Sequence, residues 1–101
     1  MQFVADNKED TNGHITGGSV MGVAGIEIHW QDGLIGATGR SGALVEDVLW
    51  AALQRLQAFQ ETDLRCRENA LAITKIEEAM HWLSARTQDR IARGVAHSYQ
   101  S

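Results

Sequence analysis

The chain contains no proline, a single cysteine and no long apolar run. The lone cysteine, Cys66, excludes an internal disulfide framework and a cysteine-rich zinc site. No stretch approaches the ~18 apolar residues that cross a bilayer, and the first six residues do not form a signal peptide. Positive charge is also scarce: nine Lys and Arg face thirteen Asp and Glu, which argues against broad nucleic-acid affinity. We therefore expect a cytosolic protein that binds neither membranes nor DNA or RNA.

Signatures of catalysis are missing as well. The four histidines share no metal-ligand spacing, and neither a nucleophile motif nor an isolated pair of core carboxylates occurs. We therefore expect no enzymatic activity, no metal and no cofactor, which leaves binding as the function to look for.

Glycine divides the chain into two parts. Nine of the ten glycines lie between residues 13 and 42, and residues 43–93 contain none, so a turn-rich part precedes a helix-compatible part. The polar residues 1–20 predict a flexible N-terminal arm, and residues 21–101 predict a single domain.

A β-hairpin is predicted at about 24–39. Apolar and polar residues alternate over residues 25–31, which is the pattern of a strand with one buried and one solvent-exposed face. Asp32-Gly33 then suits the type I′ turn of a two-residue hairpin, and pairing across it places apolar residues opposite one another. The glycine-rich segment that follows, Gly36–Gly42, could approach a phosphate, although turn chemistry alone explains it.

Two amphipathic helices are predicted, at about 43–60 and about 63–93. Glu61-Thr62-Asp63 separates them, and Thr62 or Asp63 can cap the second helix. A short break between long helices predicts an antiparallel helical hairpin, so the fold class is α+β, with the β-hairpin first. Each helix carries a seam of residues at alternating spacings of three and four, as in a heptad pattern, and all of them are apolar except Asn69. They are Val45, Leu49, Ala52, Leu56 and Phe59 in the first helix, and Cys66, Asn69, Ile73, Ile76, Met80 and Leu83 in the second.

Further apolar residues lie beside these seams, where two helices and a hairpin cannot cover them: Trp50, Leu53, Leu71 and Trp82. A chain of this size has little core of its own, and another subunit is the natural cover for this surface. We therefore expect a homo-oligomer built by packing helical hairpins.

Three arginines, Arg86, Arg90 and Arg93, recur at spacings of four and three, so they share one face of the second helix. A guanidinium is a planar fork of donors that matches phosphate oxygens two at a time, so this face is suited to a phosphorylated ligand. The alternative is a solvated helix end, where the helix dipole favours cations.

Phe59 and Asn69 lie on either side of the break between the helices. An aromatic ring can stack on a base, and a side-chain amide can meet an adenine edge with one donor and one acceptor. The alternative is structural, since Phe59 could close the first seam and a seam asparagine often fixes register and oligomeric state.

A series of sequence blocks, taken in order, resembles the Thoeris anti-defence protein 1 family of phages over roughly residues 25–95. The helical-hairpin part is also similar to the anti-CBASS sponge family, which shares that module. The blocks are His29–Gly33, Gly39–Gly42, Glu46–Val48, Arg55–Gln60, Cys66–Ala79 and Arg86–Val95.

The resemblance implies a non-enzymatic sponge that assembles as a homohexamer in the cytoplasm of the infected bacterial host. It implies that cyclic ADP-ribose isomers bind between subunits, withheld from their effector, and that cyclic di- or trinucleotides of CBASS signalling can bind at a separate site. Carried over residue by residue, it implies that Phe59 stacks on the adenine and Asn69 contacts it. It further implies that Arg86 and Arg90 bind the pyrophosphate and that Arg40 contacts a ribose or phosphate.

These implied contacts carry a geometric condition. In an antiparallel hairpin Phe59 and Asn69 lie at the break, whereas Arg86 and Arg90 lie ~25–30 Å away at the other end of the second helix. The groups can meet on one small ligand only if a second subunit brings its helix end to this break.

Two other functions stay open at this stage. The chain could be an oligomeric helical adaptor that binds a protein partner, with Phe59 and Asn69 as seam residues. It could also be a hydrolase or lyase that destroys the signal rather than holding it.

Overall fold

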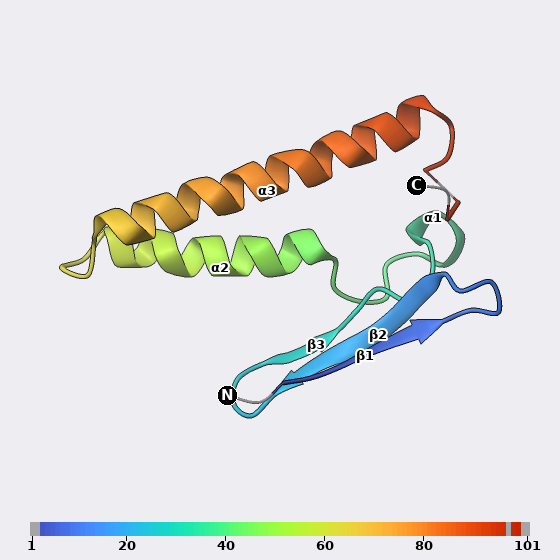
Figure 1. Cartoon of the computed structure of the whole chain (residues 1–101), viewed down its shortest axis with the longest axis horizontal. Helices are drawn as coiled ribbons and strands as arrows, with labels where there is room; N and C mark the ends of the chain where they lie inside the picture. Colours follow the sequence, from blue (N-terminus) through green and yellow to red (C-terminus); the bar gives the residue numbers. More distant parts are fainter. Residues whose placement is uncertain (1–2, 97, 100–101) are drawn as a thin grey trace. The chain divides into compact units, whose positions relative to one another are not determined.

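Figure 1 shows the computed structural model of the chain, which describes residues 3–96 and 98–99. The predicted α+β fold class is confirmed. The chain forms two compact units, one holding the residues up to Leu44 with those from Gly94 onward, and the other holding Val45–Arg93. The elements in chain order are β1 (Phe3–Glu9), β2 (Ile15–Gly22), β3 (Glu27–His29), α1 (Ile35–Thr38), α2 (Val45–Gln60) and α3 (Arg67–Ala92).

The first unit contains a three-stranded antiparallel sheet in the order β1-β2-β3. The flexible arm predicted for residues 1–20 is wrong where the structure describes it, because β1 and most of β2 lie there. Every residue of β1 is exposed, so the strand has no buried face and leaves no alternating apolar pattern in the sequence. Gly18 lies opposite Asn7 with φ +133°, and a Cβ there would overlap the Asp6 carbonyl oxygen, so this close pairing requires glycine.

Asp10 closes the turn between β1 and β2. Its Oδ1 accepts the backbone N–H groups of Asn12 at 2.8 Å and His14 at 3.0 Å. The hydrogen bond from the His14 backbone is the main cause that holds the pKa of the Asp10 carboxyl below its ordinary value. Burial opposes it, and the Asn12 backbone and the His14 side chain lower the pKa further. Gly13, with φ +80°, supplies the left-handed conformation that the turn needs.

The hairpin predicted at about 24–39 does not form. β3 pairs with β2 on the side away from β1. A type I′ turn needs positive φ at both central residues, and Gly33 has φ +80° whereas Asp32 does not have a positive φ. The segment expected to pair across this turn is the short helix α1, which is followed by Gly39 at φ +76°.

The second unit is the predicted antiparallel helical hairpin, in which α2 and α3 run side by side and are joined by a short loop (Figure 1). α3 begins at Arg67, later than the predicted start near residue 63. Its N-cap is Cys66, whose Sγ accepts the backbone N–H of Asn69 at 3.4 Å, rather than Thr62 or Asp63. Cys66 is exposed. Neither these helices nor α1 is long and apolar enough to cross a membrane, within the described residues.

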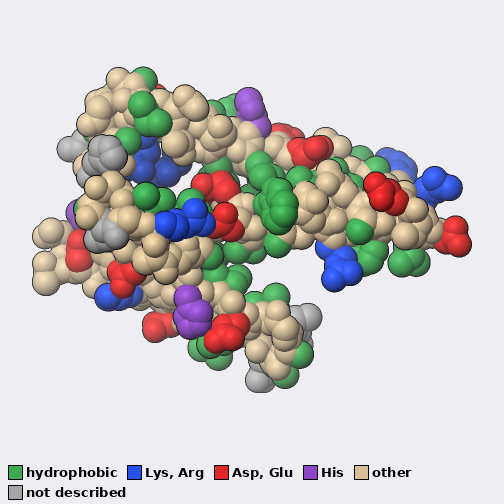
Figure 2. Space-filling view, turned by 180° about the vertical axis from the view of Figure 1, so that it is seen from behind, with side chains coloured by type: hydrophobic (Ala, Val, Ile, Leu, Met, Phe, Trp, Pro, Cys, Tyr) green, Lys and Arg blue, Asp and Glu red, His purple; other side chains and the backbone are tan. Residues whose placement is uncertain are grey.

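The face of α2 that packs against α3 is shifted by one residue from the predicted seam, from Ala52 to Leu53. Leu53, expected beside the seam, is buried with 7% of its surface exposed, whereas Ala52, expected on it, is exposed. A helix face through Ala52 and a helix face through Leu53 both include Leu49 and Leu56. The sequence pattern therefore fits either face, and packing against α3 selects the one with Leu53. The core is thin: over the described residues no side chain is fully buried, and hydrophobic side chains reach the surface on the face seen in Figure 2.

Candidate ligand site at the ends of the helical hairpin

The loop between α2 and α3 is held by Gln60, the last residue of α2. Its side-chain Nε2 donates to the Cys66 carbonyl oxygen, and its Oε1 accepts the Cys66 backbone N–H, both at 3.1 Å. The Gln60 amide thus both donates to and accepts from the backbone of Cys66. Two paired residues of an antiparallel sheet exchange hydrogen bonds in the same way. The end of α2 is thereby tied to the N-cap of α3.

Phe59 lies one residue before this clamp, in the last turn of α2, and its side chain is half-buried. Arg55, one helical turn earlier, places its guanidinium carbon 6.0 Å from the centre of the Phe59 ring, at the outer limit of a cation–π contact. Thr62 Oγ1 donates to the Phe59 carbonyl oxygen at 2.7 Å, which satisfies one of the last carbonyls of the helix. The half-buried ring keeps part of its surface accessible to a ligand.

Asn69 lies in the first turn of α3, across the loop from the end of α2. Its side-chain Nδ2 donates to the Leu64 carbonyl oxygen at 3.2 Å. An amide has two N–H groups, and no hydrogen bond to the Oδ1 of Asn69 occurs within the described ranges. One donor and one acceptor therefore remain, the pair that matches an adenine edge.

Arg86 and Arg90 lie one turn apart on the same side of α3, at the opposite end of that helix. Arg86 is exposed and takes part in no ion pair among the residues that the structure describes. Arg93 differs, since its Nε pairs with Asp89 Oδ2 at 2.9 Å. Arg86 is thus the stronger candidate on this face for a phosphorylated ligand, and the half-buried Arg90 lies beside it.

Arg40 belongs to the other unit, in a loop that Gln31 holds. The Gln31 Oε1 accepts the backbone N–H groups of Ser41 at 2.8 Å and Gly42 at 3.3 Å, and its Nε2 donates to the Gly39 carbonyl oxygen at 2.8 Å. Arg40 Nε itself donates to the Gly42 carbonyl oxygen at 2.8 Å.

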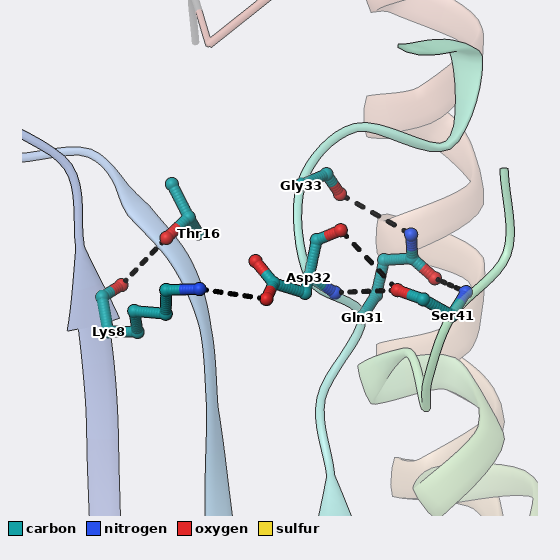
Figure 3. Close-up of polar contacts among 6 residues, drawn as sticks. All are labelled: Lys8, Thr16, Gln31, Asp32, Gly33 and Ser41. Carbon is teal, nitrogen blue, oxygen red and sulfur yellow. Dashed lines mark hydrogen bonds and ion pairs between the residues drawn. The ribbon is translucent and has the colours of Figure 1, made fainter. Parts of the chain in front are cut away.

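Further contacts tie this loop to the strands (Figure 3). Asp32 accepts from Lys8 at 2.9 Å, and the Asp32 backbone N–H donates to Ser41 Oγ at 3.0 Å. Because the N–H groups of Ser41 and Gly42 already donate to Gln31, they are not presented to a phosphate. The phosphate interpretation of the Gly36–Gly42 segment therefore loses the backbone donors of its last two residues, and Arg40 is the loop's cationic group.

The predicted site residues thus fall into three groups within one chain. Phe59 and Asn69 flank one loop, Arg86 and Arg90 share the far end of α3, and Arg40 lies in the first unit. At 1.5 Å per residue, Asn69 is about 26 Å from Arg86 along the helix axis, so one chain does not bring the residues at the loop together with the arginines of α3.

Sequence reasoning missed three residues that support the candidate site. They are Gln31 and Gln60, which clamp the two loops, and Arg55, which lies over the Phe59 ring. Only the spacing of Arg55 four residues before Phe59 left a signal in the sequence. Gln31 and Gln60 left no such signal, because no sequence spacing indicates that a glutamine side chain will reach across a loop.

These observations define a class of protein: helical hairpins that carry aromatic, amide and guanidinium groups at their ends. Residues 24–88 match the family described as "Acb2/Tad1, hairpin domain", and the chain belongs to this family. It is also similar to a protein of Bacillus phage SBSphiJ7 named "Thoeris anti-defense 1", with 42% identity over 73 residues. The similar segment covers 72% of this chain and 51% of the relative, so the chain matches about half the length of that protein.

Proposed function

We propose that this protein is a phage anti-defence sponge. It binds cyclic ADP-ribose isomers produced by the Thoeris system in the infected host cytoplasm and sequesters them without cleaving them. The observation that carries the proposal is the 42% identity to a protein named "Thoeris anti-defense 1", together with the family's hairpin domain. Binding of cyclic di- or trinucleotides of CBASS signalling is the extension that the shared domain suggests.

The chemistry of the hairpin ends supports this ligand class. A cyclic ADP-ribose isomer carries one adenine and a pyrophosphate, so it needs a stacking surface, an edge reader and guanidinium groups. Phe59 offers the ring, and Asn69 offers one donor and one acceptor. Arg86 and Arg90 offer paired guanidiniums one helical turn apart, and Arg40 is a candidate for a ribose or phosphate contact.

The proposal requires an assembly of several copies, a homohexamer by resemblance. Asn69 and Arg86 are about 26 Å apart along α3, too far for one small ligand, so the ring and the guanidiniums must come from different copies. The exposed apolar surface supports such an assembly, because Trp50 is 57% and Trp82 64% exposed in a single chain. Burial of such surface is the main force in forming obligate oligomers.

The test is an incubation of the protein with a mixed pool of cyclic ADP-ribose isomers and cyclic oligonucleotides. The protein is separated from free ligand and heated, and the released material is identified by mass spectrometry. A sponge releases intact cyclic ADP-ribose isomer, an enzyme releases linear products, and a protein adaptor retains no nucleotide. Native mass measurement of the same sample gives the number of copies per assembly.

A further inference from the structure

The contacts of the interhelix loop form a continuous path between the two residues proposed to hold the adenine. Phe59 is joined covalently to Gln60, whose amide makes both hydrogen bonds to Cys66. Cys66 in turn accepts the backbone N–H of Asn69 on its Sγ. Each step of the path from ring to amide is thus a covalent bond or a hydrogen bond.

The other side-chain hydrogen bonds of this loop are local. Thr62 binds the Phe59 carbonyl and the Leu64 backbone N–H, so it shapes the first half of the loop. Asn69 binds the Leu64 carbonyl, so it shapes the second half. The Gln60 amide differs because it joins the last residue of α2 directly to the N-cap of α3.

We infer that Gln60 is a positioning residue for the ligand, which sets the separation of Phe59 and Asn69 by clamping Cys66. The inference rests on the proposed function, in which those two residues hold one adenine. Gln60 need not touch the ligand itself. Its contribution is to hold the ring and the amide in place before binding, so that binding does not have to order the loop.

Three variants test the inference in the full chain. Gln60→Ala removes both hydrogen bonds to Cys66. Gln60→Glu keeps the size and an acceptor for the Cys66 N–H, but as a carboxylate it has no proton to donate to the carbonyl. Gln57→Ala is the matched control, an exposed glutamine less than one turn earlier on α2. Among the residues that the structure describes, its side-chain amide hydrogen-bonds only to Gln54, at 3.4 Å.

Two measurements are made on each variant. Calorimetry with cyclic ADP-ribose isomers as probes gives Kd, and amide hydrogen exchange gives the protection of the Cys66 and Asn69 N–H groups. For Gln60→Ala we expect binding weakened about tenfold and faster exchange at both amides, since two net-stabilising hydrogen bonds are lost. Gln57→Ala is expected to match the unmodified protein in both.

Gln60→Glu supplies a readout that general destabilisation would not produce. Below the ordinary glutamate pKa of about 4.3 the carboxyl gains a proton and can donate to the Cys66 carbonyl as the amide did. The ratio of its Kd to that of the unmodified protein should therefore fall toward one as the pH is lowered. The neighbouring acids Glu61 and Asp63 are present in both proteins, so the ratio removes their effect.

Unchanged Kd in Gln60→Ala, or a Gln60→Glu ratio that does not recover at low pH, would overturn the inference. If the unmodified protein binds none of the probes, the proposed function fails and the ligand role of Gln60 fails with it. The exchange data separate the two cases. Faster exchange with unchanged Kd means that the clamp exists but does not position the ligand, and unchanged exchange means that there is no clamp.

Discussion

Asn69 and Arg90 lie in the first and last turns of the same helix, about 32 Å apart along its axis at 1.5 Å per residue. A rigid helix between them means that a single chain cannot close both around one small ligand. Any site that uses both must combine the loop end of one hairpin with the arginine end of another. The proposed function therefore requires that at least two copies of the chain assemble.

The first prediction is complementation between two inactive variants. Asn69→Ala and Arg90→Ala should each bind cyclic ADP-ribose isomers weakly. When the two are co-expressed, a fraction of the sites combines an intact Asn69 from one chain with an intact Arg90 from the other. Calorimetry should then show recovery of high-affinity sites. A mixture that binds no better than the two separate proteins would place both residues in one chain's site or in none.

The second prediction concerns the strength of the individual contacts. Arg86→Ala and Asn69→Ala should each weaken binding about tenfold or more, since a hydrogen bond to a charged group contributes about 1.5–3 kcal/mol and an unsatisfied polar partner costs a similar amount. The melting temperature of Arg86→Ala should stay unchanged, because Arg86 is exposed, whereas Asn69→Ala also loses the hydrogen bond to the Leu64 carbonyl and should melt slightly lower. Lys75→Ala is the control, an exposed cation on α3 whose ion pair with Glu78 is 3.8 Å long. Unchanged affinity in both site variants would reject the assignment.

The third prediction concerns the thin core. Leu53→Ala should lower the free energy of unfolding by about 2 kcal/mol, at the low end for a large-to-small core change, because the surrounding packing is open and can relax. Leu64→Ala removes the same atoms from a side chain that is 65% exposed in the loop, and should change stability by less than about 0.5 kcal/mol. Urea unfolding of both variants makes the comparison. Equal effects would mean that Leu53 is not part of the core.

The fourth prediction is an acid sensitivity of the β1–β2 turn. The folded pKa of Asp10 is lowered from 3.8, so the stability it contributes is fully present above pH 3.8 and is lost as the pH falls through the lowered folded value. The protection factors of the His14 and Asn12 amides, taken relative to the intrinsic exchange rate at each pH, should fall over that interval. Asp10→Asn keeps an acceptor for both N–H groups and should remove this pH dependence.

A matched control for that experiment is Asp6→Asn on β1. No side-chain hydrogen bond involves Asp6 within the described part of the chain, so its substitution should leave the exchange profile of the turn as it was. If Asp6→Asn and Asp10→Asn shift the profile equally, the acid effect belongs to the net charge of the sheet and not to the turn.

Part of the fold was readable in the sequence because its causes are local. A stretch without glycine or proline and with apolar residues at spacings of three and four has few alternatives to helix, so α2, α3 and their antiparallel pairing were predictable. Placing Phe59 and Asn69 on either side of one loop then followed directly. The start of α3 was less certain, because Thr62, Asp63 and Cys66 can all cap a helix and only the geometry of the loop selects one.

By itself, then, the sequence determined the helical hairpin, its family and the chemical groups at its two ends. Tertiary structure decided the rest, because the deciding contacts join residues far apart in the chain or depend on the reach of one side chain. β1 pairs with β2 although it has no buried face, so its sequence carries no alternating apolar pattern that would predict a strand. Asp32 contacts Lys8 and Ser41 and does not form a hairpin turn. The amide of Gln60 reaches Cys66 only because the loop folds back on itself, and no spacing rule in a sequence encodes that return.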